Sequence, residues 1–463
     1  MGEEEGARLC ELMTRAHLAG VPTSRTLWSH VANALDASCD HQPPYHLASQ
    51  LLAASVGHPL ASALPRDPVH SWEVVHWLRD QWSARGWDIP TEFTTCAGAP
   101  SPDEPPELFY KTYVGWGGGG VGNVGVTLLE SGGGIVHNTT GLTTWYGAAI
   151  LAGWAVDNSA ILAGRRVLEL GAGVGFTASV ILTTPDTDHP PPLTYTVTDC
   201  HHHVLTLLHH NLALNLAPSP PQRDQLEKFQ RETSLEVALG EVEAGQVVTW
   251  RPPSTSALTL TAAAPAAAVV PGAGVTTEVC VMQVDWRHPP RLPPADLLLA
   301  ADVVYARHLI PPLVALIRSI LDGSASRQDK GKRQQTSKMK GHSRERGAVV
   351  QEDEAPGHGE KFREKETTSK DDDTAGNDEG GTRGGDGVER EAFIACTRRS
   401  QETVGVFLEE VSRQGLQHKL VYQATLDTHT ALFLYNETHL PVKIYRITLL
   451  QEPSDRGNGR RHS

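Results

Sequence analysis

A glycine loop is the clearest chemical feature of this sequence. It lies in the segment VLELGAGVGF, where a short apolar run leads directly into Gly171, Gly173 and Gly175. A buried strand that ends in such a loop brings bare backbone against a nucleotide-like ligand at the start of a helix. The dinucleotide fingerprint G-x-G-x-x-G would need its third glycine at the position of Phe176. With Glu169 before it, the loop has instead the E/D-x-G-x-G-x-G spacing typical of S-adenosyl-L-methionine enzymes.

This spacing carries a chemical reason and leaves one alternative. No diphosphate needs to be cradled, and an acidic side chain near the loop favours a cationic sulfonium ligand. The alternative is a tight strand-to-helix turn that binds nothing. We therefore predict S-adenosyl-L-methionine as the cofactor, with Glu169 among the residues that bind it.

Acidic and aromatic residues close the two apolar runs that follow the loop. Asp199 ends LTYTVTD, where a carboxylate could accept hydrogen bonds from both ribose hydroxyls, cap the next helix, or do both. Asp285 and Trp286 end VMQVDW, where they could hydrogen-bond to and stack on an adenine ring. An ordinary core tryptophan is the alternative for Trp286. Together these residues predict an adenosine site.

The run AADVVY ends in a pattern suited to an ammonium group. Enzymes that methylate nucleic-acid bases or glutamine usually carry Asn/Asp-Pro-Pro-aromatic here, whereas this chain has Asp302 and Tyr305 in an Asp-x-x-Tyr pattern. A lysine amine has a pKa of about 10.4 and must lose a proton before it attacks a methyl group. Asp302 could hold the cation while Tyr305 desolvates it and lowers that pKa. The alternative for Asp302 is a helix N-cap.

Neither the histidines nor the cysteines predict a metal site. Five histidines cluster at 201–203 and 209–210, but no carboxylate or cysteine set completes a ligand geometry. The six cysteines are scattered, without a C-x-x-C pair or a disulfide framework. We expect no metal and reduced thiols.

These residues need a scaffold, and the pattern of apolar runs predicts one. Strands and helices alternate, which indicates a mainly parallel sheet covered on both faces, with an antiparallel pair at one end. The class expected is a Rossmann-like α/β fold with a mostly helical N-terminal region and disordered insertions. Strands are expected at 124–131, 165–171, 193–199, 279–286, 295–305, 392–399, 429–436 and 442–450; helices at 70–82, 139–158 (after an initial loop), 175–182, 202–215, 309–321 and 401–415.

Length and composition indicate the domain organisation. The 463 residues exceed one ordinary domain, and 43 glycines with 31 prolines indicate loop-rich insertions. We expect a helical N-terminal region at 1–112, a catalytic domain at 124–450, and a disordered tail at 451–463. Insertions are expected at 217–274 and at 323–390, the latter disordered because it is charged and nearly devoid of apolar residues.

The same numbers bear on partners. A formal net charge of −14 argues against nucleic acid as a partner. No apolar run is long enough to cross a bilayer and no secretory signal is present, so no membrane partner is expected. The oligomeric state stays open.

The chain resembles the seven-β-strand protein-lysine methyltransferases, also called methyltransferase family 16, and within it the subfamily that acts on elongation factor 2. The segments TTGLTTWYGAAILAGWAVDN, VLELGAGVGF, DCHHHVLTLLHHNLALN, VDW and AADVVY match it in order and spacing, and LFYKTYVGW resembles the N-terminal region of that subfamily. By this resemblance the cofactor contacts correspond to Trp145, Gly171, Ala172, Gly173, Trp286 and Ala301, the ribose acid to Asp199, and the Asp/Glu-x-x-Tyr/Phe signature to Asp302 and Tyr305.

The resemblance implies a protein-lysine N-methyltransferase that uses S-adenosyl-L-methionine, acts on a lysine of elongation factor 2 and works in the cytoplasm. Two other functions stay open. One is methylation of another protein or of a small amine. The other is a non-catalytic, protein-binding scaffold that keeps the fold. An NAD-dependent oxidoreductase is disfavoured by Phe176.

Overall fold

The computed structural model describes the chain over several ranges with gaps between them. The described residues within 1–326 and 389–450 belong to one compact unit. Most of the insertion expected at 217–274, most of that at 323–390, the tail at 451–463 and the strand expected at 429–436 lie outside the described residues. Residues 248–250 of the first insertion are described, and they form a short strand of the main sheet. The described ranges are 3–23, 26–38, 45–64, 66–95, 108–116, 124–132, 139–184, 186, 188–216, 248–250, 277–326, 389–397, 401–424 and 441–450.

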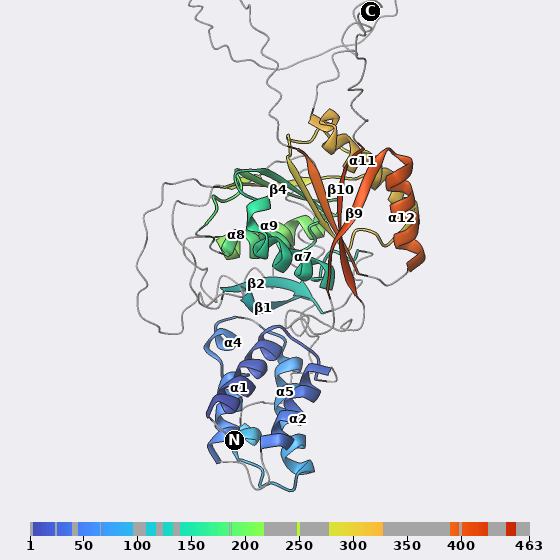
Figure 1. The fold of residues 1–463 in the computed structure, drawn as a ribbon. Helices are drawn as coiled ribbons and strands as arrows, with labels where there is room; N and C mark the ends of the chain where they lie inside the picture. Colours follow the sequence, from blue (N-terminus) through green and yellow to red (C-terminus); the bar gives the residue numbers. More distant parts are fainter. Residues whose placement is uncertain are drawn as a thin grey trace, which may run out of the picture. The chain divides into compact units, whose positions relative to one another are not determined.

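The N-terminal part of the chain is helical over its described residues (Figure 1). The helix predicted at 70–82 is confirmed as α5. It begins where Asp67 accepts a hydrogen bond from the backbone N–H of Val69 at 2.8 Å, with Pro68 in its first turn. Trp28 and Trp82 are fully buried between these helices. The helices are α1 (Glu3–Leu18), α2 (Thr26–Ser38), α3 (Tyr45–Ala54), α4 (Pro59–Ala63), α5 (Pro68–Ala84) and α6 (Glu92–Thr95).

A two-stranded antiparallel sheet follows. It consists of β1 (Leu108–Trp116) and β2 (Val124–Ser131). The strand predicted at 124–131 is confirmed, but its partner is β1, to which the sequence assigned no element. This hairpin is separate from the main sheet.

Two asparagines of α9 (His202–Leu216) hold the hairpin. The Asn211 amide accepts from the N–H of Leu129 at 2.7 Å and donates to its carbonyl at 3.2 Å. The Asn215 amide pairs in the same way with Thr127, at 2.9 and 2.7 Å. The two side chains, one helical turn apart, therefore satisfy the edge of β2 as a third strand would.

The main sheet has eight strands in the order β5-β6-β4-β3-β7-β8-β10-β9. The pairs β6–β4, β4–β3, β3–β7 and β7–β8 are parallel, and β10 runs antiparallel to both β8 and β9. A short antiparallel strand, β5, is added beside β6. The strands are β3 (Arg166–Leu170), β4 (Thr194–Asp199), β5 (Val248–Trp250), β6 (Glu278–Gln283), β7 (Leu297–Ala301), β8 (Glu391–Thr397), β9 (Leu416–Gln423) and β10 (Val442–Leu449).

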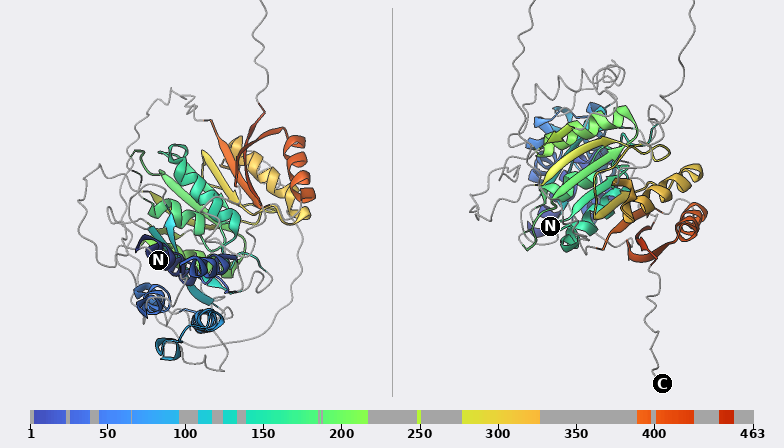
Figure 2. Two further views of the ribbon diagram at one scale, coloured as in Figure 1. Left: turned by 60° about the horizontal axis from the view of Figure 1, so that its bottom comes forward. Right: turned by 90° about the horizontal axis from the view of Figure 1, so that it is seen from above.

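Helices cover both faces of this sheet (Figures 1 and 2). Side chains alternate along each strand, so Val167 packs with the first helical layer and Leu168 with the second. The first layer holds α7 (Tyr146–Asp157), α8 (Phe176–Thr183) and α9; the second holds α11 (Ile310–Leu321) and α12 (Gln401–Arg413). The predicted Rossmann-like α/β class is confirmed, with β5 added to seven strands of the expected kind.

The antiparallel edge differs from the prediction in one strand. An antiparallel pair closes the sheet, but the described partner of β10 on this side is β9 at 416–423, where the sequence predicted no strand. The strand expected at 429–436 is not among the described residues. Most of β9 is exposed, so it lacks the apolar alternation that marks a half-buried strand.

The described residues contain no helix that is both long and apolar enough to cross a bilayer.

Candidate functional site

Four parallel strands end together at one edge of the sheet. The register aligns Leu170 of β3 with Thr198 of β4 on one side and with Ala300 of β7 on the other. From β3 the chain moves outward to β4 and β6, then crosses to β7 on the opposite side. Ligands of open α/β sheets bind outside the carboxyl ends of the strands, where the order reverses in this way. The residues that follow β3, β4, β6 and β7 therefore lie together at this switch point, which is the candidate site and is called the crevice below.

The glycine loop after β3 requires its glycines. Gly171, Gly173 and Gly175 have φ values of +65°, +55° and +89°, in the left-handed region that other L-residues seldom adopt. A Cβ on Gly171 would lie 2.8 Å from Cγ1 of Val303, and one on Gly175 would lie 2.6 Å from Cδ1 of Leu208. Gly175 then begins α8 as its N-cap. The loop thus presents backbone in close packing, as the spacing predicted.

Asp199 lies against this loop. One carboxylate oxygen accepts a hydrogen bond from the N–H of Gly173 at 3.2 Å, and the other accepts from the N–H groups of Cys200 and His201 at 2.8 and 3.3 Å. Burial raises the pKa of Asp199, while these hydrogen bonds act to lower it. Asp199 therefore holds the turn that leads toward α9 and places an acid beside the glycine loop.

Trp286 also lies against the loop, because a Cβ on Gly171 would be 3.4 Å from Cζ2 of its indole. The indole is partly buried and packs against the second helical layer. Asp285 instead points into an exposed ion pair with Arg287, with contacts of 2.8 and 3.0 Å. Hydrogen bonds from Arg287 lower the pKa of Asp285. Of these two residues, Trp286 has the closer contact with the glycine loop.

The side chain of Glu169, on strand β3, is buried between the sheet and the first helical layer. It is 2% exposed and accepts a hydrogen bond from the hydroxyl of Tyr195 at 2.9 Å. Burial raises its pKa to about 7, against hydrogen bonds from Tyr195 and Thr177 that lower it. Because Thr177 is in the first turn of α8, Glu169 supports the glycine loop from beneath.

Asp302, directly after β7, binds two distant elements. One carboxylate oxygen accepts from the N–H of Gly147 at 2.9 Å and from the hydroxyl of Thr397 at 2.9 Å, and the other accepts from the N–H of Thr397 at 2.8 Å. Among the described residues other than glycine, Asp302 alone has a positive φ, of 53°. Its carboxylate thus caps the first turn of α7 from across the crevice. A helix N-cap was the alternative considered for Asp302. The helix that it caps is α7, which precedes Asp302 in the chain.

Tyr305 and Trp145 meet the same short segment. Tyr305 is 51% exposed. Partial burial, and then the charges of Cys200 and Asp199, raise the pKa of Tyr305, while a hydrogen bond with Thr140 acts to lower it. The indole N–H of Trp145 donates to the carbonyl of Thr140 at 2.6 Å. Ala172 and Ala301 are partly buried beside the same strand ends. The structure thus gathers the predicted residues around the crevice, with Glu169 beneath it and Asp285 turned toward Arg287.

The sequence reading missed Glu130, a carboxylate with no exposed surface at the end of β2. It accepts from the hydroxyl of Tyr113 at 2.8 Å and from the N–H and hydroxyl of Thr144 at 3.0 and 2.7 Å. Lys111 forms an ion pair with it at 3.7 Å. Glu130 thereby fixes the segment that leads to Trp145. No local pattern marks it, since its partners come from β1 and from the loop before α7.

No group of three or more His, Cys, Asp or Glu side chains in the described ranges could hold a metal ion.

Searches of known proteins give relatives of one kind. The chain is 33% identical over 211 residues to the protein-lysine N-methyltransferase EEF2KMT of Bos taurus, a match of 46% of this chain and 58% of that protein. It is 27% identical over 331 residues to EEF2KMT of Mus musculus, covering 70% and 63%. The chain is thus related to the EEF2KMT protein-lysine N-methyltransferases, and it spans about three fifths of their length. No family model matches.

Two solved structures match this chain at low TM-scores. The methyltransferase domains of bacterial CtHen1-CN and CtHen1-C have TM-scores of 0.29 and 0.28 and identities of 10% and 12%. Each match covers 65% of this chain and 98% or 97% of the other.

Proposed function

We propose that this relative of the EEF2KMT enzymes is a protein-lysine N-methyltransferase that uses S-adenosyl-L-methionine. The observation that carries the proposal is the crevice itself, where a left-handed glycine loop, Asp199 and Trp286 meet at the switch point of a Rossmann-like sheet. Its agreement with the names of the sequence relatives supports the same chemistry.

The residues around the crevice fit the cofactor. Asp199 offers a carboxylate to the ribose hydroxyls next to the glycine loop, and Trp286 offers an aromatic surface to adenine. Trp145, Ala172 and Ala301 complete the proposed contacts. When bound, S-adenosyl-L-methionine supplies an electrophilic methyl group on a sulfonium. Glu169 and Asp285, proposed from sequence as direct contacts, fit better as a support beneath the loop and as a residue at the rim.

The chain's own part in catalysis is to position and desolvate the amine. An in-line displacement depends mainly on alignment of the two reacting groups. We assign Asp302 to the ammonium of the incoming lysine and Tyr305 to the apolar wall beside it. Three protein donors already engage the Asp302 carboxylate, which fixes its direction, while its second oxygen accepts only one of them. A carboxylate oxygen accepts two hydrogen bonds, so one acceptor position is left for the substrate.

The substrate we propose is a lysine of elongation factor 2 in the cytoplasm. This finer assignment rests on the names of the relatives and on the segments that resemble that subfamily. A different protein substrate or a small amine would use the same crevice, and a scaffold that has lost catalysis would keep its fold.

One labelling experiment separates these functions. A lysate that lacks the protein is incubated with the recombinant full chain and S-adenosyl-L-methionine carrying a radioactive methyl group. The proposal predicts one labelled protein at the mass of elongation factor 2. Label in another protein or in small molecules would identify that protein or a small amine as the substrate. No label, together with no S-adenosyl-L-methionine binding by calorimetry, would identify a scaffold.

A further inference from the structure

The side chain of Glu130 joins the hairpin to the segment that enters α7. Glu130 lies near the end of β2 and has no exposed surface, whereas the residues of the crevice follow strands of the main sheet. The backbone next to it also contacts this segment, since the N–H of Ser131 donates to the carbonyl of Leu142 at 2.8 Å. The hairpin is therefore attached to the chain just before Trp145, which the proposed function assigns to the cofactor.

Both oxygens of the Glu130 carboxylate accept hydrogen bonds. Oε1 accepts from the hydroxyls of Tyr113 and Thr144 at 2.8 and 2.7 Å. Oε2 accepts from the N–H of Thr144 at 3.0 Å and from the hydroxyl of Thr143 at 3.3 Å. Because a carboxylate oxygen accepts about two hydrogen bonds, these donors satisfy the group. Thr144 supplies one donor from its side chain and one from its backbone, so the carboxylate fixes the main chain directly before Trp145.

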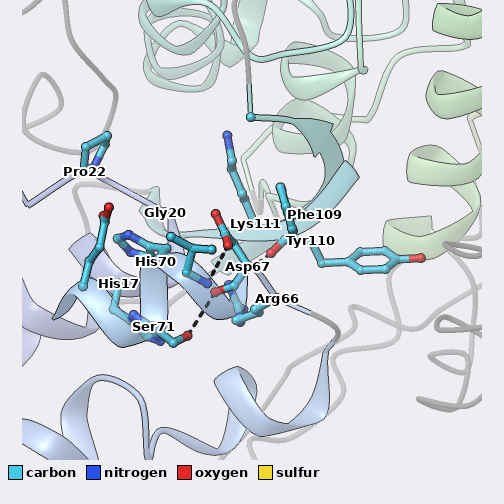
Figure 3. A pocket seen from close by; sticks show the side chains of 13 residues that line it. His17, Gly20, Pro22, Arg66, Asp67, His70, Ser71, Phe109, Tyr110 and Lys111 are labelled. Carbon is cyan, nitrogen blue, oxygen red and sulfur yellow. Dashed lines mark hydrogen bonds between the residues drawn. The ribbon is translucent and has the colours of Figure 1, made fainter. Parts of the chain in front are cut away.

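Lys111 of β1 supplies the opposite charge. Its side chain is nearly buried, and its Nζ lies 3.7 Å from Oε2 of Glu130. Lys111 also lines a cavity of about 170 Å³ between the end of α1, the start of α5 and β1. Figure 3 shows its amine directed away from His17 and His70 of that cavity. Since a buried charge without a partner is costly, the ion pair and the hydrogen bonds together hold the carboxylate of Glu130 in this position.

Asp302 holds the same segment on the other side of Trp145. Its carboxylate accepts from the N–H of Gly147 at 2.9 Å. Trp145 lies between the two anchors as the N-cap of α7, with an extended backbone (φ −100°, ψ 152°) and no capping hydrogen bond from its own side chain. Its indole N–H donates to the carbonyl of Thr140 at 2.6 Å. Two carboxylates from different elements thus fix the backbone on either side of this tryptophan, and a third contact fixes its ring.

We propose that Glu130 is a positioning residue for the cofactor, which holds the indole of Trp145 at the crevice through Thr144. The inference rests on the proposed function, in which Trp145 contacts S-adenosyl-L-methionine. A side chain that is already held in its binding direction loses little conformational freedom when the ligand binds, so the affinity is higher. Glu130 is buried in the hairpin and acts through its neighbours. Its removal should therefore raise KM for S-adenosyl-L-methionine and leave kcat nearly unchanged at saturating cofactor.

The test is a double-mutant cycle on the affinity of the full chain for S-adenosyl-L-methionine, measured by calorimetry. In Glu130→Gln an NH2 donor replaces one acceptor oxygen and the ion pair with Lys111 is lost, so binding should weaken about tenfold. When Trp145→Ala is already present, the same substitution should change the affinity by less than about twofold, because the side chain that Glu130 positions is gone. A general structural role would weaken binding equally in both backgrounds.

Two hydroxyls that donate to the same oxygen of Glu130 give a matched pair of milder variants. Thr144→Val removes the donor next to Trp145, and it should weaken S-adenosyl-L-methionine binding about threefold. Tyr113→Phe removes the donor from β1 and keeps the ring that packs on Phe176, so it should bind the cofactor as the unchanged protein does. This pair decides the question if Glu130→Gln does not fold.

Hydrogen exchange of the ligand-free chain measures the positioning itself. Backbone amides in peptides covering residues 139–147 should exchange faster in Glu130→Gln and Thr144→Val than in Tyr113→Phe. The inference is overturned if folded Glu130→Gln binds with unchanged affinity, if its loss of affinity persists in full beside Trp145→Ala, or if Thr144→Val and Tyr113→Phe bind alike. No binding of S-adenosyl-L-methionine by the unchanged protein would overturn the proposed function and this inference with it.

Discussion

At the scale of single residues, Asp302 has two tasks that can be separated. Its carboxylate caps α7 through Gly147 and holds Thr397 of β8, and the proposed function adds the substrate ammonium. The structural contacts are present without substrate, whereas the proposed contact with the ammonium needs the lysine of the substrate. A variant that weakens the structural contacts without removing the carboxylate therefore distinguishes them.

Asp302→Ala should abolish methyl transfer and destabilise the fold by about 3 kcal/mol, because it leaves buried donors unpaired. Thr397→Val removes one hydroxyl donor and keeps the carboxylate. It should lower the unfolding temperature yet retain most of the activity. Thermal unfolding and single-turnover methylation measure the two effects. Equal losses of activity in both variants would make Asp302 a structural residue only.

Glu169 gives a prediction of pH dependence. Its pKa is raised by burial from 4.5 to about 7, so the folded state keeps a proton that the unfolded state has lost in this range. The free energy of unfolding therefore falls as pH rises through this range, by about 3 kcal/mol from this group. Glu169→Gln removes the titration. Urea unfolding measures the free energy of unfolding of the variant and of the unchanged protein at pH 4.5 and at pH 8. The difference, variant minus unchanged protein, should be higher at pH 8 than at pH 4.5 by about 3 kcal/mol.

Glu409 supplies the control, since it is exposed on α12. Glu409→Gln should change stability by the same small amount at both pH values. If Glu169→Gln behaved like this control, the buried carboxyl would not titrate as described.

At the scale of elements, α9 links the hairpin to the site. Asn211 is fully buried and, besides its two bonds to Leu129, donates to the carbonyl of Val174 in the glycine loop at 2.9 Å. One side chain thus connects the edge of β2, helix α9 and the loop that is proposed to hold the cofactor.

Asn211→Ala should destabilise the fold by about 2–4 kcal/mol, since it leaves three backbone groups without partners. It should also weaken S-adenosyl-L-methionine binding, because the glycine loop loses a support. His209→Ala, on the exposed side of the same helix, should change stability by less than about 0.5 kcal/mol. Urea unfolding and calorimetry measure both. Unchanged cofactor affinity in Asn211→Ala would show that Asn211 does not support the glycine loop for cofactor binding.

The sequence predicted the elements that carry their own pattern. The apolar runs of β3, β4, β6 and β7 and the amphipathic α11 were correctly assigned, and the chemical residues at the strand ends followed from them. What could not be predicted depends on pairing between distant segments. β9 is a strand because β10 lies beside it, and the hairpin is separate because α9 caps its edge. Likewise Asp302 meets Thr397, 95 residues away, and Glu130 meets Thr144.

At the scale of the whole molecule, residues 327–388 interrupt the sheet between α11 and β8. Described contacts fix both flanks of this segment. Arg291 donates to the carbonyl of Ser326 at 3.1 Å, and Arg165 donates to the carbonyl of Glu389 at 2.9 Å and pairs with Glu391 at 2.5 Å. The strands on either side thus have their own anchors, in line with the proposed single catalytic domain at 124–450.

Replacement of residues 327–388 by a Gly/Ser linker of about 15 residues should leave the unfolding temperature within a few degrees of that of the full chain. The anchors at both flanks remain, so cofactor binding should persist as well. Thermal unfolding and calorimetry check this. Failure of the shortened chain to fold would show that the segment contributes to the unit that carries the site.

The activity proposed for this chain is methyl transfer to a lysine of elongation factor 2. The most direct measurement incubates the full chain with purified, unmethylated elongation factor 2 and S-adenosyl-L-methionine bearing a deuterated methyl group, and maps the product by peptide mass spectrometry. We predict deuterated methyl on one lysine, with none when Asp302→Ala replaces the enzyme. Absence of deuterated methyl from every lysine, under conditions where the chain binds S-adenosyl-L-methionine, would contradict the proposed activity.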